Sequence, residues 1–360
     1  MNQPPPIVII GAGLAGAACA YELVQTGHRR VLIVERAARS GQHGSAQNAG
    51  LIRSHASNPF TAAVARSGAA WWGSQSLVPF EASGSVLIGG RSGELMAGFR
   101  PKEHRWLTAC QSYNLVGHPL PPKRRAFFNP ADGVGDPAAL VDALLGAAQE
   151  HGAQLRVNCT AQLDGETLWL DGERQPFDHL VIAAGAWSAE LLALPVQAFA
   201  RHLVLHRTEA LRAAPWVWDL DEELYWRPHP EGLLLSACDE RVVHRPDPEQ
   251  WPAVVDEALE ELERKLGSAY PGLLPLEGLE SWSGLRVLTP DDGFILGPDP
   301  RRARVLWCTA LGGHGVTCCV PAAQLALQAI TGRPLDADQL RNQRAHSAER
   351  FATLDETWHG

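Results

Sequence analysis

Three glycines restrict the fold of this chain more than any other feature. Gly11, Gly13 and Gly16 form a G-x-G-x-x-G pattern that directly follows the buried, β-branched run 7–10. In a strand–turn–helix unit, the first glycine permits the tight turn, the second lets a pyrophosphate approach bare backbone, and the third allows the helix to pack closely on the strand. Apolar residues then recur at helical spacing as far as Gly27. The pattern predicts a strand–helix unit that binds a dinucleotide.

The acidic residue of such a unit is also present. A second buried run, 31–34, ends at Glu35, which lies 19 residues after Gly16. A carboxylate in this place can accept hydrogen bonds from the ribose hydroxyls of adenosine, while the helix N-terminus attracts the pyrophosphate. NAD and FAD share the ADP half that these residues would bind, so the first motif leaves both cofactors open.

Two further strand-to-glycine crossings favour FAD. The run 179–188, "HLVIAAGAWS", ends a buried strand at Ala184 and Gly185, and the strand 305–309 leads into "GGHGV" at 312–316. A long loop rich in glycine, serine and asparagine, 36–59, also replaces the quick return to a third strand that a simple nicotinamide domain shows. A large cofactor lying across the edge of a sheet needs several such crossings, and a helix beginning after the third would stabilise a reduced flavin.

Composition limits the alternatives. A length of 360 residues predicts two packed domains. The net charge of −9 argues against nucleic acid as a partner, and the one dense basic cluster, 121–128, is interpreted as a solvated loop. The seven cysteines show no metal-binding spacing, so no metal site is expected. No apolar run reaches the length of a membrane span, and we expect a cytoplasmic protein, with peripheral contact with the inner membrane left open.

Several motifs together carry a resemblance. "GAGLAG" with Glu35, "HLVIAAGAWS", "WSGLR" followed by "DDGFILG", and "GGHGV" resemble the FAD-dependent D-amino-acid oxidase superfamily, in the branch of glycine and sarcosine oxidases and D-amino-acid dehydrogenases. The order and spacing match from residue 7 to about residue 332. Within the branch, "WDLDEELYWRPHPEGLLLSA" and "DPEQ" are most similar to the D-arginine dehydrogenase type.

The resemblance implies an α/β fold of two interleaved domains (α+β in its domain arrangement). A Rossmann-like FAD-binding domain would comprise residues 1–80, 135–198 and 285–340. A substrate-binding domain built on an antiparallel sheet would comprise 81–134 and 199–284, and a C-terminal tail would comprise 341–360.

The expected cofactor contacts lie in the three crossings, the long loop and their surroundings. They are Gly11, Gly13, Leu14, Ala15, Gly16, Glu35, Arg36, His43, Gly44, Ser45, Asn48, Ala49, Gly50, Ala161, Ala184, Gly185, Trp187, Arg286, Gly312, Gly313, His314, Gly315, Val316 and Thr317.

Four residues are the catalytic candidates. Arg286 stands in an apolar, glycine-containing stretch, where a guanidinium is costly unless a carboxylate meets it. The resemblance implies that it binds the substrate carboxylate, with Tyr225 and Arg207 as further donors and His43 beside the flavin. The alternatives are a salt bridge from Arg286 to Asp291 or Asp292, a packing role for Tyr225, a surface ion pair for Arg207 and an ordinary loop position for His43.

Departures from the family pattern qualify the expectation. The segment 287–299 contains no cysteine, so we expect non-covalent FAD. No lysine occurs between Lys123 and Lys265, which favours an electron acceptor other than oxygen, although O2 and a quinone both stay open. Ser85 stands near the place where the D-arginine type has a carboxylate, which puts basic substrates in doubt. Tryptophans 216, 218, 226 and 282 either pack the sheet or form a bulky pocket.

The predicted reaction is FAD-dependent oxidation of the C–N bond of a small amino acid, either a D-amino acid or a glycine-like one. Hydride transfer to flavin N5 would give an imine, which water converts to a 2-oxo acid and ammonia. The alternatives are oxidation of an N-alkyl or cyclic imino acid or a 2-hydroxy acid, a flavin-binding subunit without turnover, and an NAD-dependent dehydrogenase. The acidic balance argues against an RNA-modifying amine oxidase of this fold.

Overall fold

A six-stranded sheet contains the predicted dinucleotide unit. The computed structural model describes residues 4–90, 105–208, 214–244, 246–278 and 280–351. All neighbouring strands of this sheet are parallel except β20 and β21, an antiparallel pair at one edge. Its order is β20 (Ile295–Asp299), β21 (Arg302–Thr309), β13 (Leu180–Ile182), β1 (Ile7–Ile10), β2 (Val31–Val34) and β9 (Gln154–Arg156).

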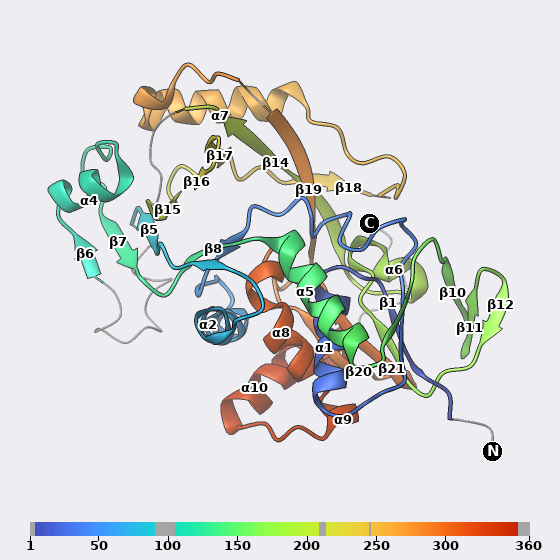
Figure 1. The fold of residues 1–360 in the computed structure, drawn as a ribbon. Coiled ribbons are helices and arrows are strands. Elements are labelled where there is room, and N and C mark those ends of the chain that lie inside the picture. Colours follow the sequence, from blue (N-terminus) through green and yellow to red (C-terminus); the bar gives the residue numbers. More distant parts are fainter. Residues whose placement is uncertain (1–3, 91–104, 209–213, 245, 279, 352–360) are drawn as a thin grey trace.

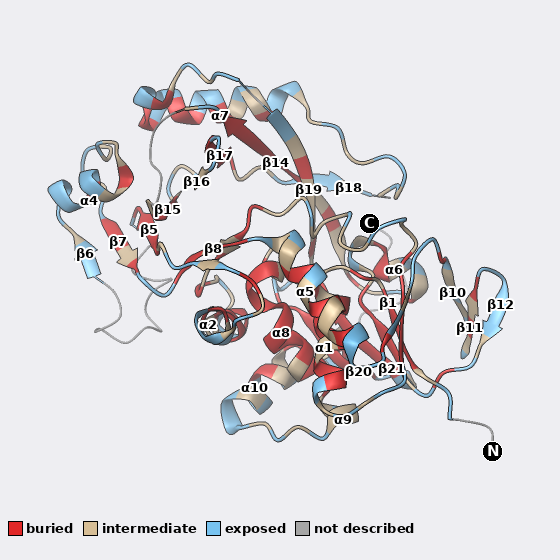
Figure 2. Cartoon of the chain, in the orientation of Figure 1, coloured by how far each residue is buried: buried red, intermediate tan, exposed pale blue. Residues whose placement is uncertain are grey.

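Both faces of this sheet are covered, which explains why its strands are apolar throughout. Alternate side chains of β1 point to opposite sides: Ile9 packs with the helical layer, and Val8 packs with Leu168 of a small meander. The helical layer consists of α1 (Leu14–Gln25), α5 (Pro137–Glu150), α8 (Gly315–Ala326) and α2 (Pro59–Ser74), which pack side by side (Figure 1). The residues of α1 and α8 are mostly buried (Figure 2).

The second sheet has nine strands and is mostly antiparallel. Helix α7 (Asp256–Ala269) covers one of its faces, where Leu262 and Leu266 pack on Val204 and Trp226 (Figure 1). The strand order is β18 (Arg241–Val243), β14 (Gln197–His206), β17 (Gly232–Ser236), β16 (Leu224–His229), β15 (Trp216–Asp219), β5 (Ser85–Ile88), β7 (Ala126–Asn129) and β6 (Arg105–Leu107), with β19 (Glu280–Leu288) paired to β14.

Two small sheets and several short helices complete the fold. The remaining strands are β3 (Leu51–Ile52), β8 (Gly133–Gly135) and β4 (Phe80–Glu81) in one three-stranded sheet, and β10 (Ala161–Asp164), β11 (Thr167–Leu170) and β12 (Glu173–Gln175) in the meander. The remaining helices are α4 (Ala109–Val116), α6 (Ser188–Leu191), α9 (Gln328–Thr331) and α10 (Ala337–Ala345), with short 3-10 turns η1 (Gly185–Trp187), η2 (Pro271–Leu273) and η3 (Ala348–Phe351). No helix of the described ranges is both long enough and apolar enough to span a bilayer.

The structure refines the predicted division of the chain. The mixed α/β architecture and the interleaving of two sheets agree with expectation, but β19 is one continuous strand across residue 285. Arg286 therefore belongs to the nine-stranded sheet, here called the substrate-side sheet, and not to the six-stranded sheet, here called the cofactor-side sheet. Lys265 lies on α7, where its ammonium group donates to the carbonyl oxygen of Ala237 at 2.8 Å.

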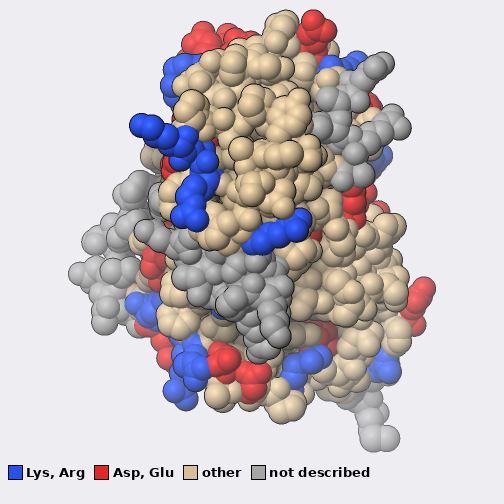
Figure 3. Space-filling view, turned by 90° about the vertical axis from the view of Figure 1, so that its left-hand side faces the viewer, with Lys and Arg blue, Asp and Glu red and all other residues tan. Residues whose placement is uncertain are grey.

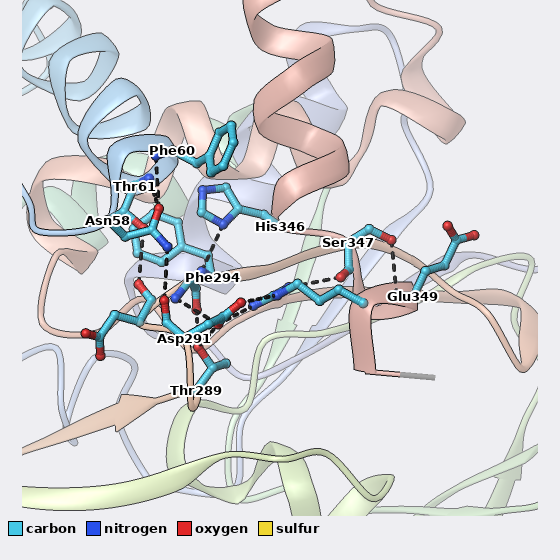
Figure 4. A network of polar contacts seen from close by, with 12 residues as sticks. Asn58, Phe60, Thr61, Thr289, Asp291, Phe294, His346, Ser347 and Glu349 are labelled. Atoms are coloured by element: carbon cyan, nitrogen blue, oxygen red, sulfur yellow. Dashed lines mark hydrogen bonds and ion pairs between the residues drawn. The ribbon is translucent and has the colours of Figure 1, made fainter. Parts of the chain in front are cut away.

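The segment predicted as a C-terminal tail is part of the fold as far as residue 351. The backbone N–H of Phe294 donates to Nδ1 of His346 at 3.0 Å, and Arg350 forms an ion pair with Asp291 at 2.8 Å (Figure 4). Asn58, which caps the N-terminus of α2, donates to the carbonyl oxygen of Asp291, so three distant segments meet here. Burial lowers the pKa of the His346 imidazole to about 4, so the ring is neutral near pH 7.

Candidate active site

A large cavity opens at the carboxyl ends of four parallel strands. Its volume is about 440 Å³, and its wall is formed by the residues that directly follow β1, β2, β13 and β21. This edge of an open α/β sheet is where ligands bind, because the loops diverge and the helix N-termini point inward. The three predicted glycine crossings therefore meet at one site.

The first crossing has the geometry that a pyrophosphate requires. Gly11 has a φ of +102°, and a Cβ atom on Gly16 would lie 1.8 Å from the carbonyl oxygen of Gly11. Gly13 caps α1 without a side chain, and the N–H of Leu14 donates to the Ser45 hydroxyl at 2.9 Å, so the first turn of the helix lies in the cavity wall beside Ser45. The Glu35 carboxylate accepts from the N–H groups of Ala12 and Ala37, both at 2.9 Å, which fixes it at the rim of the cavity.

The third crossing brings bare backbone against a guanidinium. Gly312 and Gly313 both have positive φ, and a Cβ atom on Gly313 would lie 2.9 Å from Cζ of Arg286. Helix α8 begins at Gly315 with His314 as an N-cap that makes no side-chain capping bond. A ligand with negative charge can thus lie between the start of α8 and Arg286.

Most of the expected cofactor residues line this cavity. Those that do are Gly11, Gly13, Leu14, Ala15, Glu35, Arg36, His43, Gly44, Ser45, Asn48, Ala161, Ala184, Gly185, Trp187, Arg286, Gly312, Gly313 and Gly315. Those outside its wall are Gly16, Ala49, Gly50, His314, Val316 and Thr317. Gly16 serves helix packing, Val316 accepts from the Trp72 indole at 2.8 Å, and Thr317 accepts from the N–H of Arg53 at 3.1 Å.

A smaller cavity of about 60 Å³ adjoins the large one, and Arg286 lines both. The Arg286 side chain is 18% exposed, and Glu240, at 3.7 Å, is its carboxylate partner among the described residues. Burial, together with the charges of Arg201 and Arg53, lowers the Arg286 pKa to about 9. Asp291 is paired with Arg350 instead, so the structural alternative of an Arg286–Asp291 bridge is not present.

Tyr225 lies in the wall of the smaller cavity, as its strand predicts. It packs with Leu203 and Leu234, whereas its neighbour Trp226 packs under α7 on the opposite face. The two-residue turn between β16 and β17 sets this register, with Tyr225 opposite Ser236. Burial raises the pKa of the Tyr225 hydroxyl, which stays a neutral hydrogen-bond donor.

The structure does not bring Arg207 to the site. Its side chain is 52% exposed and pairs with Glu280 at 2.7 Å, so the alternative of a surface ion pair describes it correctly. Arg201, six residues earlier on β14, lines the smaller cavity in its place. In the pairing of β14 with β19, Phe199 lies opposite Arg286, which puts Arg201 on the same face and one step along.

Arg53 is a second site residue that the sequence did not single out. It follows β3, lines the smaller cavity, and its guanidinium lies 5.4 Å from the Trp218 ring centre. One guanidinium nitrogen, Nη2, donates to Nδ1 of His314 at 3.0 Å, so that imidazole accepts there. Burial, and next the charge of Arg53, keep the His314 pKa well below its usual value, so His314 is neutral.

The other candidates divide between wall and core. His43 lines the large cavity, edge-on to Trp187 with ring centres 4.7 Å apart. Ser85 is buried and donates to Asp132 at 2.6 Å, away from both cavity walls. Of the four tryptophans weighed for a bulky pocket, Trp218 lines the smaller cavity, and the others lie outside its wall.

The large cavity lies at the carboxyl ends of the parallel strands and has the features of a dinucleotide site. It adjoins a small pocket lined by arginines on a second sheet. This combination is typical of an oxidoreductase of the flavin type. The family can be stated as well. Residues 6–329 match the family model described as FAD dependent oxidoreductase (DAO), and the chain belongs to this family.

Relatives and solved structures agree with this assignment. The chain is 28% identical to D-amino acid dehydrogenase of Xylella fastidiosa (strain M23) over 224 residues, 58% of this chain and 49% of that protein. It is 28% identical to the tRNA 5-methylaminomethyl-2-thiouridine biosynthesis bifunctional protein MnmC of Verminephrobacter eiseniae, over 92% of this chain and 62% of that protein. The chain thus spans about half to three fifths of these relatives. The fold matches iminodiacetate oxidase from Chelativorans sp. BNC1 with a TM-score of 0.75 and 24% identity, covering 92% and 96% of the two chains.

FAD fits the residues present. The start of α1 with Ser45 beside it, the glycine turn 11–13 and the Glu35 carboxylate match the pyrophosphate and ribose of its ADP half. The flavin end would lie toward Arg286 and the start of α8, where the cavity meets the cationic pocket. FAD is accordingly the cofactor of this family member.

Proposed function

We propose that the protein oxidises the C–N bond of a small amino acid, either a D-amino acid or a glycine-like one. The observation that carries the proposal is Arg286, an enclosed guanidinium at the junction of the two cavities. Such a group is stabilised when a carboxylate meets it in bidentate fashion. The relative named D-amino acid dehydrogenase supports the same substrate class.

The side chains of the smaller cavity supply binding and orientation. Arg286 holds the substrate carboxylate, Arg201 reinforces the charge from the same sheet face, and the neutral Tyr225 hydroxyl donates to a carboxylate oxygen. Leu203 and Trp218 exclude water around the substrate carbon chain. Bound FAD supplies the hydride acceptor, and water then releases the 2-oxo acid and ammonia from the imine product.

Two details of the cofactor belong to the proposal. The FAD is held without a covalent bond, so acid precipitation should release all of the yellow colour into the supernatant. The electron acceptor is a quinone or another carrier in preference to O2, because no lysine lines either cavity within the described residues. Reoxidation of the reduced protein by air and by a soluble quinone, followed by stopped-flow absorbance, compares the two acceptors directly.

The decisive experiment is anaerobic mixing of the yellow protein with matched panels of D- and L-amino acids. Loss of the visible flavin absorbance with a D-amino acid or with glycine supports the proposal. A flavin that stays oxidised with every member of the panel refutes it and leaves a flavin-binding subunit without turnover.

A second candidate is oxidation of an N-alkylated glycine, which also presents one carboxylate to Arg286. The same carboxylate clamp would serve it, with the nitrogen substituent extending toward the cavity mouth. An RNA-borne substrate fits the charge poorly: the chain has a net charge of −9, and in the face shown in Figure 3 the Lys and Arg side chains occur in separate groups with Asp and Glu among them. Faster flavin reduction by sarcosine than by glycine or D-alanine would favour this candidate.

A further inference from the structure

The smaller cavity holds more positive charge than one carboxylate needs. Three guanidinium groups line it: Arg53 after β3, Arg201 on β14 and Arg286 on β19. They come from separate segments of the chain and face one space of about 60 Å³. Like charges in a shared, enclosed pocket repel one another, and an anion that enters the pocket offsets this repulsion.

The carboxylates of the protein balance only part of this charge. Glu240 lies 2.7 Å from Arg201 and 3.7 Å from Arg286, and it is 41% exposed at the edge of the pocket. Among the described residues, no carboxylate lies within 4 Å of the Arg53 guanidinium. Three guanidinium groups against one carboxylate leave two positive charges for the ligand.

The titratable side chains in and beside the pocket do not change this balance. His314 accepts a hydrogen bond from Arg53 and is neutral, and burial keeps the Tyr225 hydroxyl protonated. The thiol of Cys238 is neutral as well, because burial raises its pKa. His314 therefore orients Arg53 without compensating it.

The positions of the charges separate two binding points. Arg201 and Arg286 share one face of the β14–β19 pair and share Glu240. Arg53 reaches the pocket from the cofactor-side part of the chain, between His314 and the Trp218 ring. One anion can thus be held by the sheet and another by Arg53.

On the basis of the proposed function, we infer that the substrate is a short amine with two carboxylates, one bound by Arg286 and Arg201 and the second by Arg53. Acidic D-amino acids and N-carboxymethyl amino acids have this chemistry. The small volume excludes long side chains, and Arg53 repels cationic ones. The substrate class therefore differs from that of the D-arginine dehydrogenase type, which the sequence resembles most.

Isosteric pairs test this inference on the FAD-loaded protein. D-Aspartate against D-asparagine, and iminodiacetate against its monoamide, differ by one carboxylate at nearly constant shape. We expect the dicarboxylate to reduce the flavin at least about tenfold more efficiently in each pair, since a charge-assisted bond to a guanidinium is lost in the amide. Equal or better reduction by the amides overturns the inference while the proposed function stands.

A binding measurement reports on Arg53 without turnover. Malonate and its monoamide, malonamate, are titrated against the oxidised protein, and the flavin spectrum and melting temperature give the two dissociation constants. In the wild type malonate should bind at least about tenfold more tightly, and Arg53→Gln should remove most of that preference, leaving a ratio within about threefold of one. Arg207→Gln, which removes an exposed guanidinium outside the pocket, is the matched control and should keep the preference.

The outcomes separate the possible failures. If no amine reduces the flavin, the proposed function fails, and the malonate preference still decides the role of Arg53. If Arg53→Gln lowers malonate and malonamate binding equally, Arg53 serves the cofactor or the fold, and the inference is wrong. If Arg53→Gln does not fold or loses FAD, the wild-type preference decides: a ratio near one refutes the second carboxylate site.

Discussion

Replacing Arg286 by alanine tests the proposed carboxylate site most directly. Burial lowers the Arg286 pKa from its usual value to about 9, which corresponds to roughly 5 kcal/mol of destabilisation of the charged side chain in the ligand-free pocket. A bound carboxylate offsets this destabilisation, which makes the guanidinium a strong anion receptor and keeps it cationic at neutral pH.

The expected loss on substitution is smaller than that figure, because Arg201 remains beside the substrate. Removing one partner of a desolvated ion pair costs about 3–5 kcal/mol, and the lower end applies here. We therefore expect kcat/KM to fall by roughly a hundredfold or more in Arg286→Ala. Most of the change should appear in the substrate concentration needed for half-maximal flavin reduction.

Steady-state and anaerobic stopped-flow kinetics measure this change, and the flavin-to-protein absorbance ratio measures cofactor content. Arg207→Ala is the matched control, since it removes an exposed guanidinium of the same sheet and should leave kcat/KM within about twofold of the wild type. If Arg286→Ala binds FAD fully and retains kcat/KM within about threefold, Arg286 does not bind the carboxylate.

Three further predictions concern other parts of the molecule. Gly16→Ala should lower the melting temperature and FAD content, because its Cβ would meet the Gly11 carbonyl oxygen, whereas Gly146→Ala, with nothing within 4 Å, should not. Tyr225→Phe should raise KM about fivefold through loss of one neutral donor, in steady-state kinetics. His346 has a lower pKa in the folded protein than in the unfolded chain, so the unfolded chain binds a proton more readily below pH 6.5. The free energy of unfolding in urea should therefore fall by up to about 3 kcal/mol as the pH drops from 6.5 toward 4. His346→Asn should make this free energy less dependent on pH.

The sequence predicted the cofactor side of the molecule in detail because its signals are local. The glycine spacing, the apolar run before it and Glu35 determine a turn whose geometry depends on adjacent residues. Helix α5 depends on signals that are just as local, because Asp136 caps it and Pro137 is its first residue.

The substrate side depends on strand pairing, which local signals do not determine. Arg201 and Arg207 have the same parity, so strand alternation alone would put both on the same face, and in an extended strand they would lie about 20 Å apart. Only the register that places Phe199 opposite Arg286 decides which of them reaches the pocket. Arg53 reaches the pocket through the pairing of β3 with β8, whose segments lie about 80 residues apart in the sequence. No local sequence pattern near Arg53 predicts this pairing.

The order of strands in the cofactor-side sheet has a consequence for biosynthesis. Of the six strands, β1 is synthesised first and β21, which completes the sheet beside β13, is synthesised last, with α8 after it. A nascent chain that stops before residue 300 would expose an open sheet edge and lack one wall of the cavity. Uptake of the flavin must therefore wait until β21 and α8 have been made, so a nascent chain that lacks them cannot yet hold the cofactor.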